Sequence, residues 1–455
     1  MNTTRSRVVA QTAMVALGQL LTSCGTASTQ SAVSSGGSAA QGGMSGGGVS
    51  QTPGSAVSAE RVPTCPDSST HYLSEGKVPT GYCVWRFAEN LGSPRGITRD
   101  SRGQLLVIES GKNSITLLYD DDGDSYSSAT ERLTIAQAAG LNHGIALANG
   151  FLYASSDTTV YRWPYDGTRK ALGTPQTVVT GMPASGNHST RTLLFDDQGN
   201  LYINVGSAAN VDSNASRARI VRYPADIVQA GTGTWNNYEP FADGTRNEVG
   251  LRFDSQHRLW GVENGSDDLN RSDLGGDIHQ DNPAEELNLF SAPGFYGYPY
   301  CWSEGTLPNP PGLGLGRQWS YLPGASGDGT HTDDWCRNPA NVTPPVLGLQ
   351  AHSAPLDLWF YTGGSFPNDI IGSLFVTYHG SWDRTPVTGY KLVRISFGPN
   401  GMPSNTVEDF LTASNPSQPD SWGHRPVALT QGTRGELYIT SDESNVVIAI
   451  GHNGT

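Results

Sequence analysis

One pattern recurs six times along the chain: an apolar strand, a polar turn containing Asp or Gly, and a second apolar strand, often followed by a third. Alternating apolar residues joined by such turns are typical of β-hairpins. A single copy cannot bury both faces of its small sheet, whereas copies arranged in a ring do so and leave no long exposed edge. The pattern therefore predicts an all-β fold, a six-bladed β-propeller, with an open β-sandwich as the alternative. The copies lie at residues 95–119, 143–163, 191–224, 249–290, 356–397 and 425–450.

The composition agrees with a turn-rich β protein and limits its partners. Of the 455 residues, 56 are Gly and 28 are Pro, and both residue types break helices and shape turns. The formal net charge is −14. Binding to a phosphate backbone needs a basic surface, so the sequence predicts no nucleic-acid partner.

The first 24 residues predict export and lipid attachment. Arg5 and Arg7 precede an apolar stretch that ends in Leu21-Thr22-Ser23-Cys24. This end resembles a bacterial lipobox, so we expect Cys24 to carry the lipid and the lipid alone to hold the protein at a membrane. An ordinary signal peptide is the alternative. The expected location is the bacterial cell envelope, on the periplasmic side or at the outer membrane.

The composition changes twice before the repeats begin. Residues 25–60 consist almost only of Ser, Gly, Ala, Gln, Thr and Val, a composition that cannot bury a core and predicts a disordered tether. The propeller, which is the predicted catalytic domain, then spans residues 61–455.

With Cys24 lipidated, four cysteines remain, and an even number in an exported protein indicates disulfides. Of the three possible pairings we expect the local one, because each pair then brackets one loop-rich segment. Zinc is the alternative, although neither CxxC nor HxxxH spacing occurs. The expected disulfides are Cys65–Cys83 and Cys301–Cys336.

Basic and polar side chains precede the first strand of several copies. Equivalent loops of a propeller lie around one axis, so these side chains can converge on a shared site. Arg pairs with carboxylates through its planar fork, and His can act as a base near neutral pH, so such a site suits an anionic cofactor or substrate. Surface histidines are the alternative. The residues are His143, His188, Arg246, Asn247, His352, His424 and Arg425.

Oxygen-rich segments follow the fourth copy's strands. VENGSDDL at 262–269 and DNPAEELN at 281–288 offer side-chain and backbone oxygens, which are the ligands that Ca²⁺ prefers.

At these same residues the chain resembles the PQQ-dependent sugar dehydrogenases, which include soluble aldose dehydrogenases, L-sorbosone dehydrogenases and the PQQ domain of fungal pyranose dehydrogenases. The resemblance implies a six-bladed propeller that binds PQQ and Ca²⁺ over its axis. It rests on seven motifs in family order between residues 85 and 450: GNHSTRTLLF, TRNEVGLRF, VENGSDDL, DNPAEELNLF, AHSAPLDL, YHGSW and HRPVAL.

The resemblance also implies a role for each matching residue. His188 takes the place of the general base, and Arg246 and Asn247 take the place of a pair that faces the quinone. The backbone carbonyls of Gly265 and Ser266 match the Ca²⁺ ligands. Further cofactor contacts are implied for Asn264, Gly265, His352, Arg425 and either Arg384 or Lys391 in the fifth copy.

Two departures bear on specificity. The soluble glucose enzymes have an Asp that supports the base where this chain has Ser207, and a Pro where it has Ser266. Both favour a sorbosone or pyranose branch over glucose specificity.

The resemblance therefore predicts an enzyme that oxidises a sugar by hydride transfer to PQQ, with His188 as the base. No CxxCH haem-attachment motif is present, so we expect an external electron acceptor, a quinone or a cytochrome. The alternatives are a Ca²⁺-dependent lactonase-like hydrolase and a non-catalytic propeller that binds glycans or protein.

Overall fold

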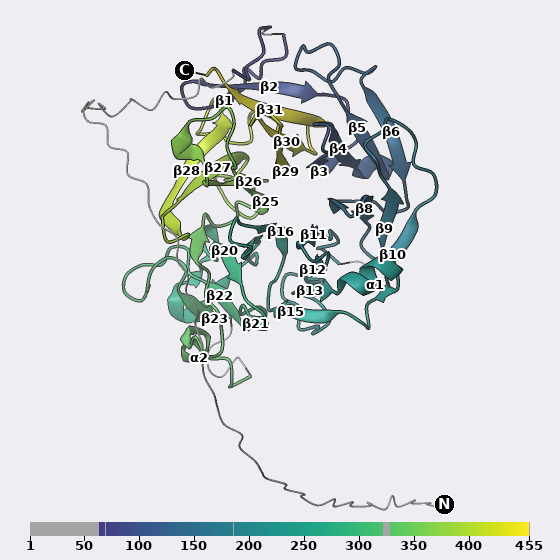
Figure 1. Ribbon diagram of the computed structural model, residues 1–455. Coiled ribbons are helices and arrows are strands. Elements are labelled where there is room, and N and C mark those ends of the chain that lie inside the picture. The colour runs from purple at the N-terminus through teal and green to yellow at the C-terminus, as the bar shows by residue number, and fades with distance from the viewer. Residues whose placement is uncertain (1–62, 69, 185, 322–327, 455) are drawn as a thin grey trace, which may run out of the picture. The chain divides into compact units, whose positions relative to one another are not determined.

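Six antiparallel sheets stand around a common axis in a computed structural model that describes residues 63–68, 70–184, 186–321 and 328–454 (Figure 1). The chain visits the sheets in sequence order, as the six repeats predict, so the six-bladed β-propeller is confirmed. The predicted lipidation site Cys24 and the predicted linker at 25–60 lie outside the described residues.

The first three blades follow one another without interruption. Blade one contains β3 (Pro94–Arg99), β4 (Leu105–Glu109), β5 (Ser114–Leu118) and β6 (Arg132–Gln137). Blade two contains β7 (Ile145–Ala148), β8 (Phe151–Ser155), β9 (Val160–Pro164) and β10 (Gln176–Thr180), with β14 (Gly233–Thr234) added in parallel. Blade three contains β11 (Leu193–Phe195), β12 (Leu201–Val205), β13 (Arg219–Tyr223) and β15 (Glu239–Asp243), with β21 (Gly294–Phe295) added in parallel.

The last three blades carry the insertion and the closure of the ring. Blade four contains β16 (Glu248–Phe253), β17 (Leu259–Glu263), β20 (Glu285–Phe290) and β24 (Leu347–Leu349). Blade five contains β25 (Pro355–Phe360), β26 (Leu374–Tyr378), β27 (Lys391–Phe397) and β28 (Pro403–Ala413), with β1 (Gly76–Lys77) at its edge. Blade six contains β29 (Pro426–Gln431), β30 (Leu437–Ser441), β31 (Val446–His452) and β2 (Tyr82–Ala88).

Strand β2 closes the ring, because this early segment pairs antiparallel with β31 near the end of the chain. In Figure 1 the purple β2 lies beside the yellow β31. The disulfide Cys65–Cys83 ties the segment before β2 to β2 itself. The expected local pairing is therefore confirmed for this pair, and so is Cys301–Cys336.

The core lies between neighbouring blades. Strands β4 and β31 are buried at every residue, because each blade packs both faces against its neighbours. One apolar cluster fills each of the six interfaces between blades, with Leu152, Ile203, Leu259, Leu374, Leu429 and Leu105 as examples.

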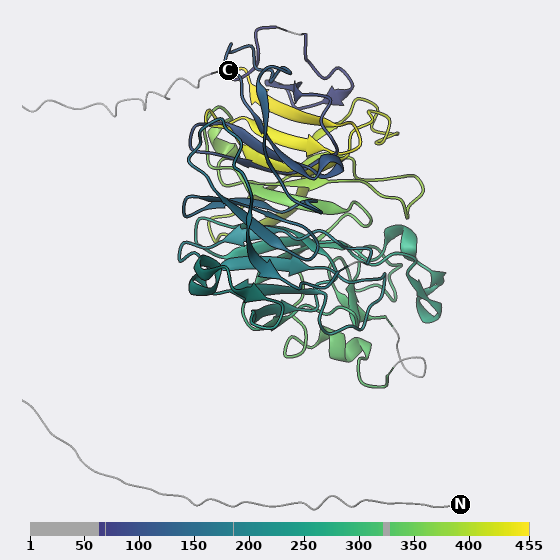
Figure 2. The same ribbon diagram turned by 90° about the vertical axis from the view of Figure 1, so that its right-hand side faces the viewer.

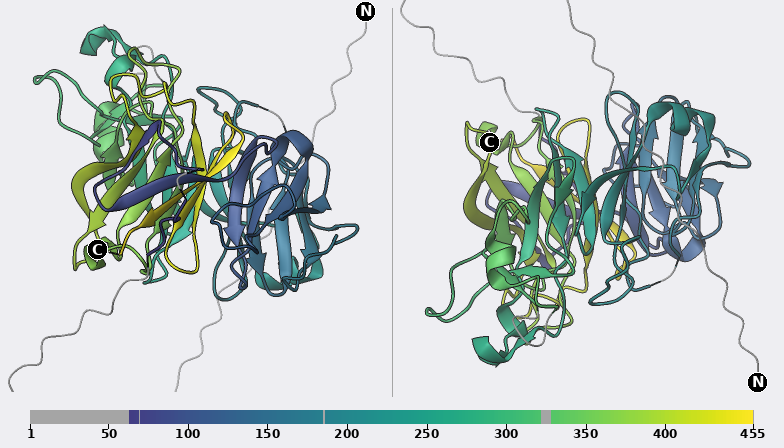
Figure 3. Two further views of the ribbon diagram at one scale, coloured as in Figure 1. Left: turned by 90° about the horizontal axis from the view of Figure 1, so that it is seen from above. Right: turned by 90° about the horizontal axis from the view of Figure 1, so that it is seen from below.

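A large insertion follows β20 and extends outside the ring at the lower left of Figure 1; Figures 2 and 3 show it projecting from one side. Its ordered core is a two-stranded hairpin that the Cys301–Cys336 disulfide joins to a short helix. No helix among the described residues is long and apolar enough to cross a membrane. The remaining short elements are α1 (Ala225–Ala230), β18 (Asn270–Arg271), β19 (Gly276–Asp277), β22 (Cys301–Ser303), β23 (Gln318–Ser320), α2 (Asp333–Arg337), η1 (Ser110–Lys112), η2 (Ser272–Leu274), η3 (His279–Asp281) and η5 (Asn368–Ile370).

Candidate active site

A polar cavity of about 120 Å³ lies where loops of blades three, four and five meet. Its walls come from the segments before the inner strands β11, β16 and β25 and from the segments after β17 and β26. The sequence-predicted loops thus converge as the propeller geometry requires. The lining residues are His188, Arg246, Asn247, Asn264, Gly265, Asp267, Glu285, His352, Ala354, Gly380, Ser381, Trp382 and Asp383.

His188 has one defined ring orientation. Its Nδ1 lies 3.0 Å from the backbone carbonyl oxygen of Ser207 and 2.9 Å from the Ser207 hydroxyl. The hydroxyl donates its own proton to the carbonyl of Ala209 at 2.8 Å. Nδ1 must therefore be the protonated nitrogen, which leaves the lone pair on Nε2.

The surroundings of His188 keep the ring neutral. Burial and the nearby Arg246 guanidinium lower the pKa of His188 to about 3. Position 206, just after β12, tolerates only glycine, because a Cβ on Gly206 would lie 2.6 Å from the Cβ of His188. His188 is thus available as a proton acceptor at neutral pH.

Arg246 is almost fully buried, and several oxygen atoms surround its guanidinium. Nη1 donates to the carbonyls of Asn264 and Gly265, at 3.1 and 2.5 Å. Nη2 donates to the Asn210 side chain at 2.9 Å and to Asp267 at 3.1 Å. This network fixes a permanent positive charge at the cavity wall.

Asn247 and Asn264 form the wall beside Arg246. The Asn247 amide donates to the Asn264 side-chain oxygen at 2.9 Å, and Asn264 in turn donates to the carbonyl of Pro355 at 2.7 Å. The Asn247 Oδ1 is buried and has no hydrogen-bond partner among the described residues. Buried polar atoms are normally satisfied, so this oxygen marks a place where a ligand or water donates.

A second ring nitrogen with a lone pair faces two carboxylates in the same cavity. His352 donates from Nε2 to the carbonyl oxygens of His279 and Asn282, at 2.5 and 3.1 Å, so its Nδ1 is unprotonated when the ring is neutral. One ligand atom each of His352, Asp267 and Asp383 lies within 4.8 Å of the others. Sequence reasoning named His352 and the segment 262–269, which contains Asp267, as sources of ligands, but it missed Asp383.

Glu285 supports the backbone of the site. Its carboxylate accepts from the amides of Gly265 and Ala354, at 2.6 and 3.0 Å, and thereby connects blades four and five. Burial raises the pKa of Glu285 to about 7. Asp267 is also affected by burial, which raises its pKa in spite of the neighbouring Arg246.

Several predicted residues lie outside the lining of this cavity in the described structure. Arg425 donates to the carbonyls of His379 and Gly380, at 3.1 and 2.9 Å, and so contacts the wall from behind. Arg384 and Lys391 form ion pairs of 2.7 Å with Asp281 and Asp409.

Ser266 and His424 also have neighbours outside the cavity. The hydroxyl of the buried Ser266 accepts a hydrogen bond from Tyr321 at 3.0 Å. His424 contacts the Ser444 hydroxyl at 2.6 Å and lies 3.6 Å from Glu75.

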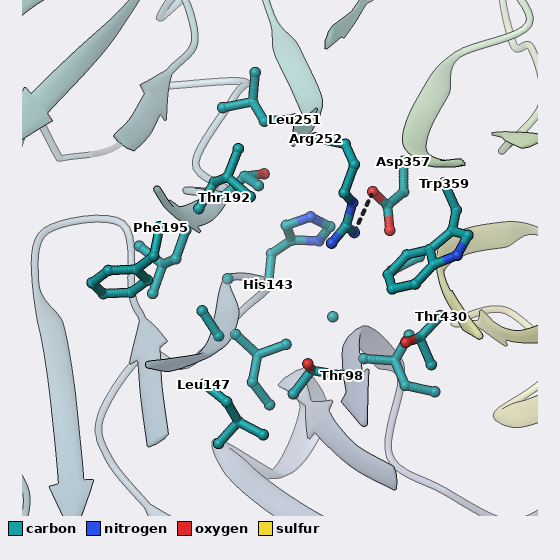
Figure 4. A pocket seen from close by; sticks show the side chains of 18 of the residues that line it. Thr98, His143, Leu147, Thr192, Phe195, Leu251, Arg252, Asp357, Trp359 and Thr430 are labelled. Atoms are coloured by element: carbon teal, nitrogen blue, oxygen red, sulfur yellow. Dashed lines mark ion pairs between the residues drawn. The ribbon is translucent and has the colours of Figure 1, made fainter. Parts of the chain in front are cut away.

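His143 lines a different cavity, in the channel along the axis, with a volume of about 220 Å³ (Figure 4). All six inner strands or the segments just before them contribute to its wall. The ion pair between Arg252 and Asp357, at 3.7 Å, faces the same space. Burial and nearby Arg95 lower the pKa of His143 to about 3, so this ring is also neutral.

One charged cluster was missed by sequence reasoning. Asp442, after β30, pairs with Arg95 at 2.5 Å and with His379 at 2.9 Å, which connects blades one, five and six near the same end of the ring. Arg95 stands at the start of the first repeat, the position at which the other candidate residues stand in their repeats. That shared position could have identified Arg95 from the sequence.

Comparisons with known proteins agree with this architecture. A PQQ-dependent sugar dehydrogenase of Hypocrea jecorina is 32% identical over 414 residues, 82% of this chain and 89% of that protein. A PQQ-dependent pyranose dehydrogenase of Coprinopsis cinerea is 33% identical over 413 residues, 82% of this chain and 54% of that protein, so this chain spans about half of its length.

The solved structures include a calcium structure of the Trichoderma reesei carbohydrate-active enzyme family AA12, with 32% identity and a TM-score of 0.74. The alignment covers 83% of this chain and 97% of that one. The model of the TrAA12-like family matches residues 76–453. By both fold and sequence, the chain belongs to the TrAA12-like family.

Proposed function

We propose that the chain is a PQQ-dependent sugar dehydrogenase that uses Ca²⁺ and a histidine base. The single observation that carries the proposal is the cavity itself, in which a neutral His188 and a buried Arg246 face one space. The relatives named for PQQ-dependent sugar or pyranose oxidation support the same reaction.

The residues present fit both groups. PQQ carries three carboxylates and a quinone, and Arg246 offers these anionic and polar oxygens a permanent positive charge. The unpartnered Oδ1 of Asn247 is an acceptor, so it suits an N–H or O–H donor of a ligand or a cation. Ca²⁺ prefers six to eight oxygen ligands, and carboxylates and carbonyls surround this space. Of the two residues that the resemblance assigns to Ca²⁺, Gly265 lines the cavity and would offer its carbonyl, which now accepts from Arg246, and Ser266 follows it in the chain. The carboxylate of Asp267 lines the same cavity and would offset the charge of the ion.

When bound, PQQ supplies an electron-accepting quinone and Ca²⁺ supplies Lewis acidity. The chain's own part is proton removal and charge stabilisation. His188 takes the proton of the sugar hydroxyl at Nε2, because Nδ1 is held by Ser207. Arg246 stabilises negative charge that develops on a bound oxygen, and its position is already fixed by its hydrogen bonds.

The remaining steps concern location and electron flow. We place the mature protein in the bacterial cell envelope, held by lipid on Cys24, and we assign reoxidation to an external quinone or cytochrome. The sequence features that support this are the lipobox-like LTSC and the absence of a CxxCH motif.

A spectroscopic reconstitution tests the proposal. Purified chain is loaded with PQQ and Ca²⁺, and the quinone absorbance is followed after sugar is added without an acceptor. Loss of the oxidised PQQ spectrum, reversed by a dye acceptor, is expected. A protein that binds no PQQ but hydrolyses a lactone in the presence of Ca²⁺ contradicts the proposal and favours the hydrolase. Asp267 and Asp383 can supply the carboxylate ligands that the Ca²⁺ of such a hydrolase needs.

A further inference from the structure

Trp382 is the most exposed large apolar side chain in the described structure, with 71% of its surface exposed. It is also the only member of that exposed group that lines the cavity of His188 and Arg246. Single exposed apolar residues are common on proteins, so exposure alone carries no conclusion. Two further observations support a conclusion: Trp382 lies at a cavity lined by polar residues, and its loop is anchored on both sides.

The loop that carries Trp382 is fixed immediately on both sides of it. Before it, the backbone amide of Ser381 donates to the Thr388 carbonyl at 2.9 Å, and the Tyr390 hydroxyl donates to the Ser381 carbonyl at 3.0 Å. These two hydrogen bonds join the beginning of the loop to its end and so fix the backbone at Ser381.

After Trp382, the loop is tied to blade four. The carboxylate of Asp383 is mostly buried and accepts from the backbone amide of Asp268 at 2.7 Å. The next residue, Arg384, pairs with Asp281 at 2.7 Å. The backbone of Trp382 is thus held between two anchored neighbours, while its indole is left with little protein to cover it.

An anchored and uncovered indole at a cavity mouth is a prepared contact surface. A rigid aromatic group supplies a large contact area at a low cost in conformational entropy. Next to it the cavity offers hydrogen-bonding groups, the carboxylate of Asp383 and the imidazole of His352. The combination of one flat apolar surface and adjacent polar groups matches a molecule that has a flat apolar face and a rim of hydroxyls.

We propose that Trp382 is the platform for the ring of a pyranose substrate, whose C–H face lies on the indole while its hydroxyls meet the polar cavity wall. This inference rests on the proposed function and specifies the substrate class at the same site. A closed pyranose ring presents several C–H groups on one face, whereas an acyclic polyol of the same carbon count has no fixed face. Trp382 therefore selects ring sugars over open-chain ones.

The test compares Trp382→Ala and Trp382→Phe with wild type, and uses Ile371→Ala as the matched control. Ile371 is 49% exposed and lies outside the lining of this cavity. A panel of aldopyranoses first identifies one that the wild-type protein loaded with PQQ and Ca²⁺ oxidises, and Trp382→Ala is expected to raise KM for that sugar roughly tenfold with kcat nearly unchanged. KM for the acyclic D-glucitol should change much less, Trp382→Phe should restore most of the affinity, and Ile371→Ala should match wild type.

Direct binding separates this inference from the proposed function. Saturation-transfer difference NMR detects methyl β-D-glucopyranoside on the loaded protein without turnover. A wild-type signal that disappears in Trp382→Ala supports the platform even if no sugar is oxidised, in which case the proposed function alone fails. A wild-type protein that binds no pyranoside, or a Trp382→Ala variant with unchanged KM and unchanged binding, overturns the inference. PQQ titration of each variant shows whether the cofactor is still bound.

Discussion

Ser207 holds the imidazole of His188 by Nδ1, with its carbonyl and its hydroxyl both within 3.0 Å of that nitrogen. The soluble glucose enzymes have an Asp at this position, according to the resemblance described above. Here the same result, a defined tautomer with a free Nε2, comes from a neutral residue. The hydrogen bond to the Ser207 carbonyl raises the pKa of His188, but burial and the positive charge of Arg246 outweigh it, so the pKa stays at about 3.

His188→Ala is expected to slow single-turnover reduction of PQQ by sugar by a factor of about 10²–10⁴, which is the usual cost of removing a positioned base. PQQ and Ca²⁺ should stay bound. Ser207→Ala is the matched variant: it keeps the carbonyl contact and should lose only a few-fold. Stopped-flow absorbance measures both rates. A His188→Ala rate within a few-fold of wild type would remove this residue from the mechanism.

Arg246→Ala should weaken PQQ binding by about 1.5–3 kcal/mol, the range for a contact with a charged group, because the permanent positive charge beside the anionic cofactor is lost together with the wall that its hydrogen bonds hold. Lys391→Ala removes a cation that pairs with Asp409 outside the cavity lining and should leave PQQ binding unchanged. Fluorescence titration with PQQ in the presence of Ca²⁺ gives both dissociation constants. Equal affinities for the two variants would mean that the guanidinium of Arg246 has a structural role. Arg425 lies outside the cavity lining, which it contacts through the carbonyl of Gly380, so Arg425→Ala should weaken PQQ binding less than Arg246→Ala does.

His143 predicts an acid-sensitive stability. Its folded-state pKa lies at about 3, well below the ordinary 6.5, because burial and Arg95 oppose the charged ring while Asp442 only partly compensates. The unfolded chain therefore takes up a proton as the pH falls below 6.5, and the folded chain does not. This favours unfolding by about 2 kcal/mol at pH 5 relative to pH 7.5. Denaturant unfolding of the apoprotein should show a weaker dependence on pH in His143→Asn than in wild type.

The disulfide Cys301–Cys336 should stabilise the insertion. It closes a loop with a sequence separation of 35, for which the chain-entropy model gives roughly 3–4 kcal/mol. Replacing both cysteines by Ser should lower the melting temperature and open the insertion to proteolysis before the ring unfolds. Peptide mapping under non-reducing conditions should find this pair and Cys65–Cys83 linked, and free thiols at these positions would be inconsistent with the structure.

Cys24→Ser should release the protein from membranes, because buried lipid chains are the attachment that the sequence predicts. Fractionation of cells that express either form distinguishes the two cases. If the variant still sediments with membranes, the lipobox interpretation is wrong or another contact holds the protein.

The six repeats were sufficient to predict the fold, because each contains the alternation and the turns of one blade. The role of β2 was not predicted, since nothing local to Tyr82–Ala88 indicates that its partner is β31. The candidate site was likewise predicted only in part. The phase of the repeats placed His188, Arg246, Asn247 and His352 correctly around one cavity.

The same rule failed for His143 and His424, because a residue's place before a strand does not determine which way its side chain points. Asp267 and Asp383 could not be paired from sequence either. They lie on different blades, and only the packing of the two loops brings their carboxylates near His352.

The pairing of β2 with β31 has a consequence for how the molecule is made. Strand β2, which completes blade six, is synthesised before the strands of blades one to five except β1, whereas its partner β31 is the last of the described strands. Until then β2 has a free edge and blade six lacks its outer strand, so neither can form the native apolar interface. Closure of the ring therefore cannot precede the synthesis of β31, and the apolar faces of both elements need protection from aggregation until then.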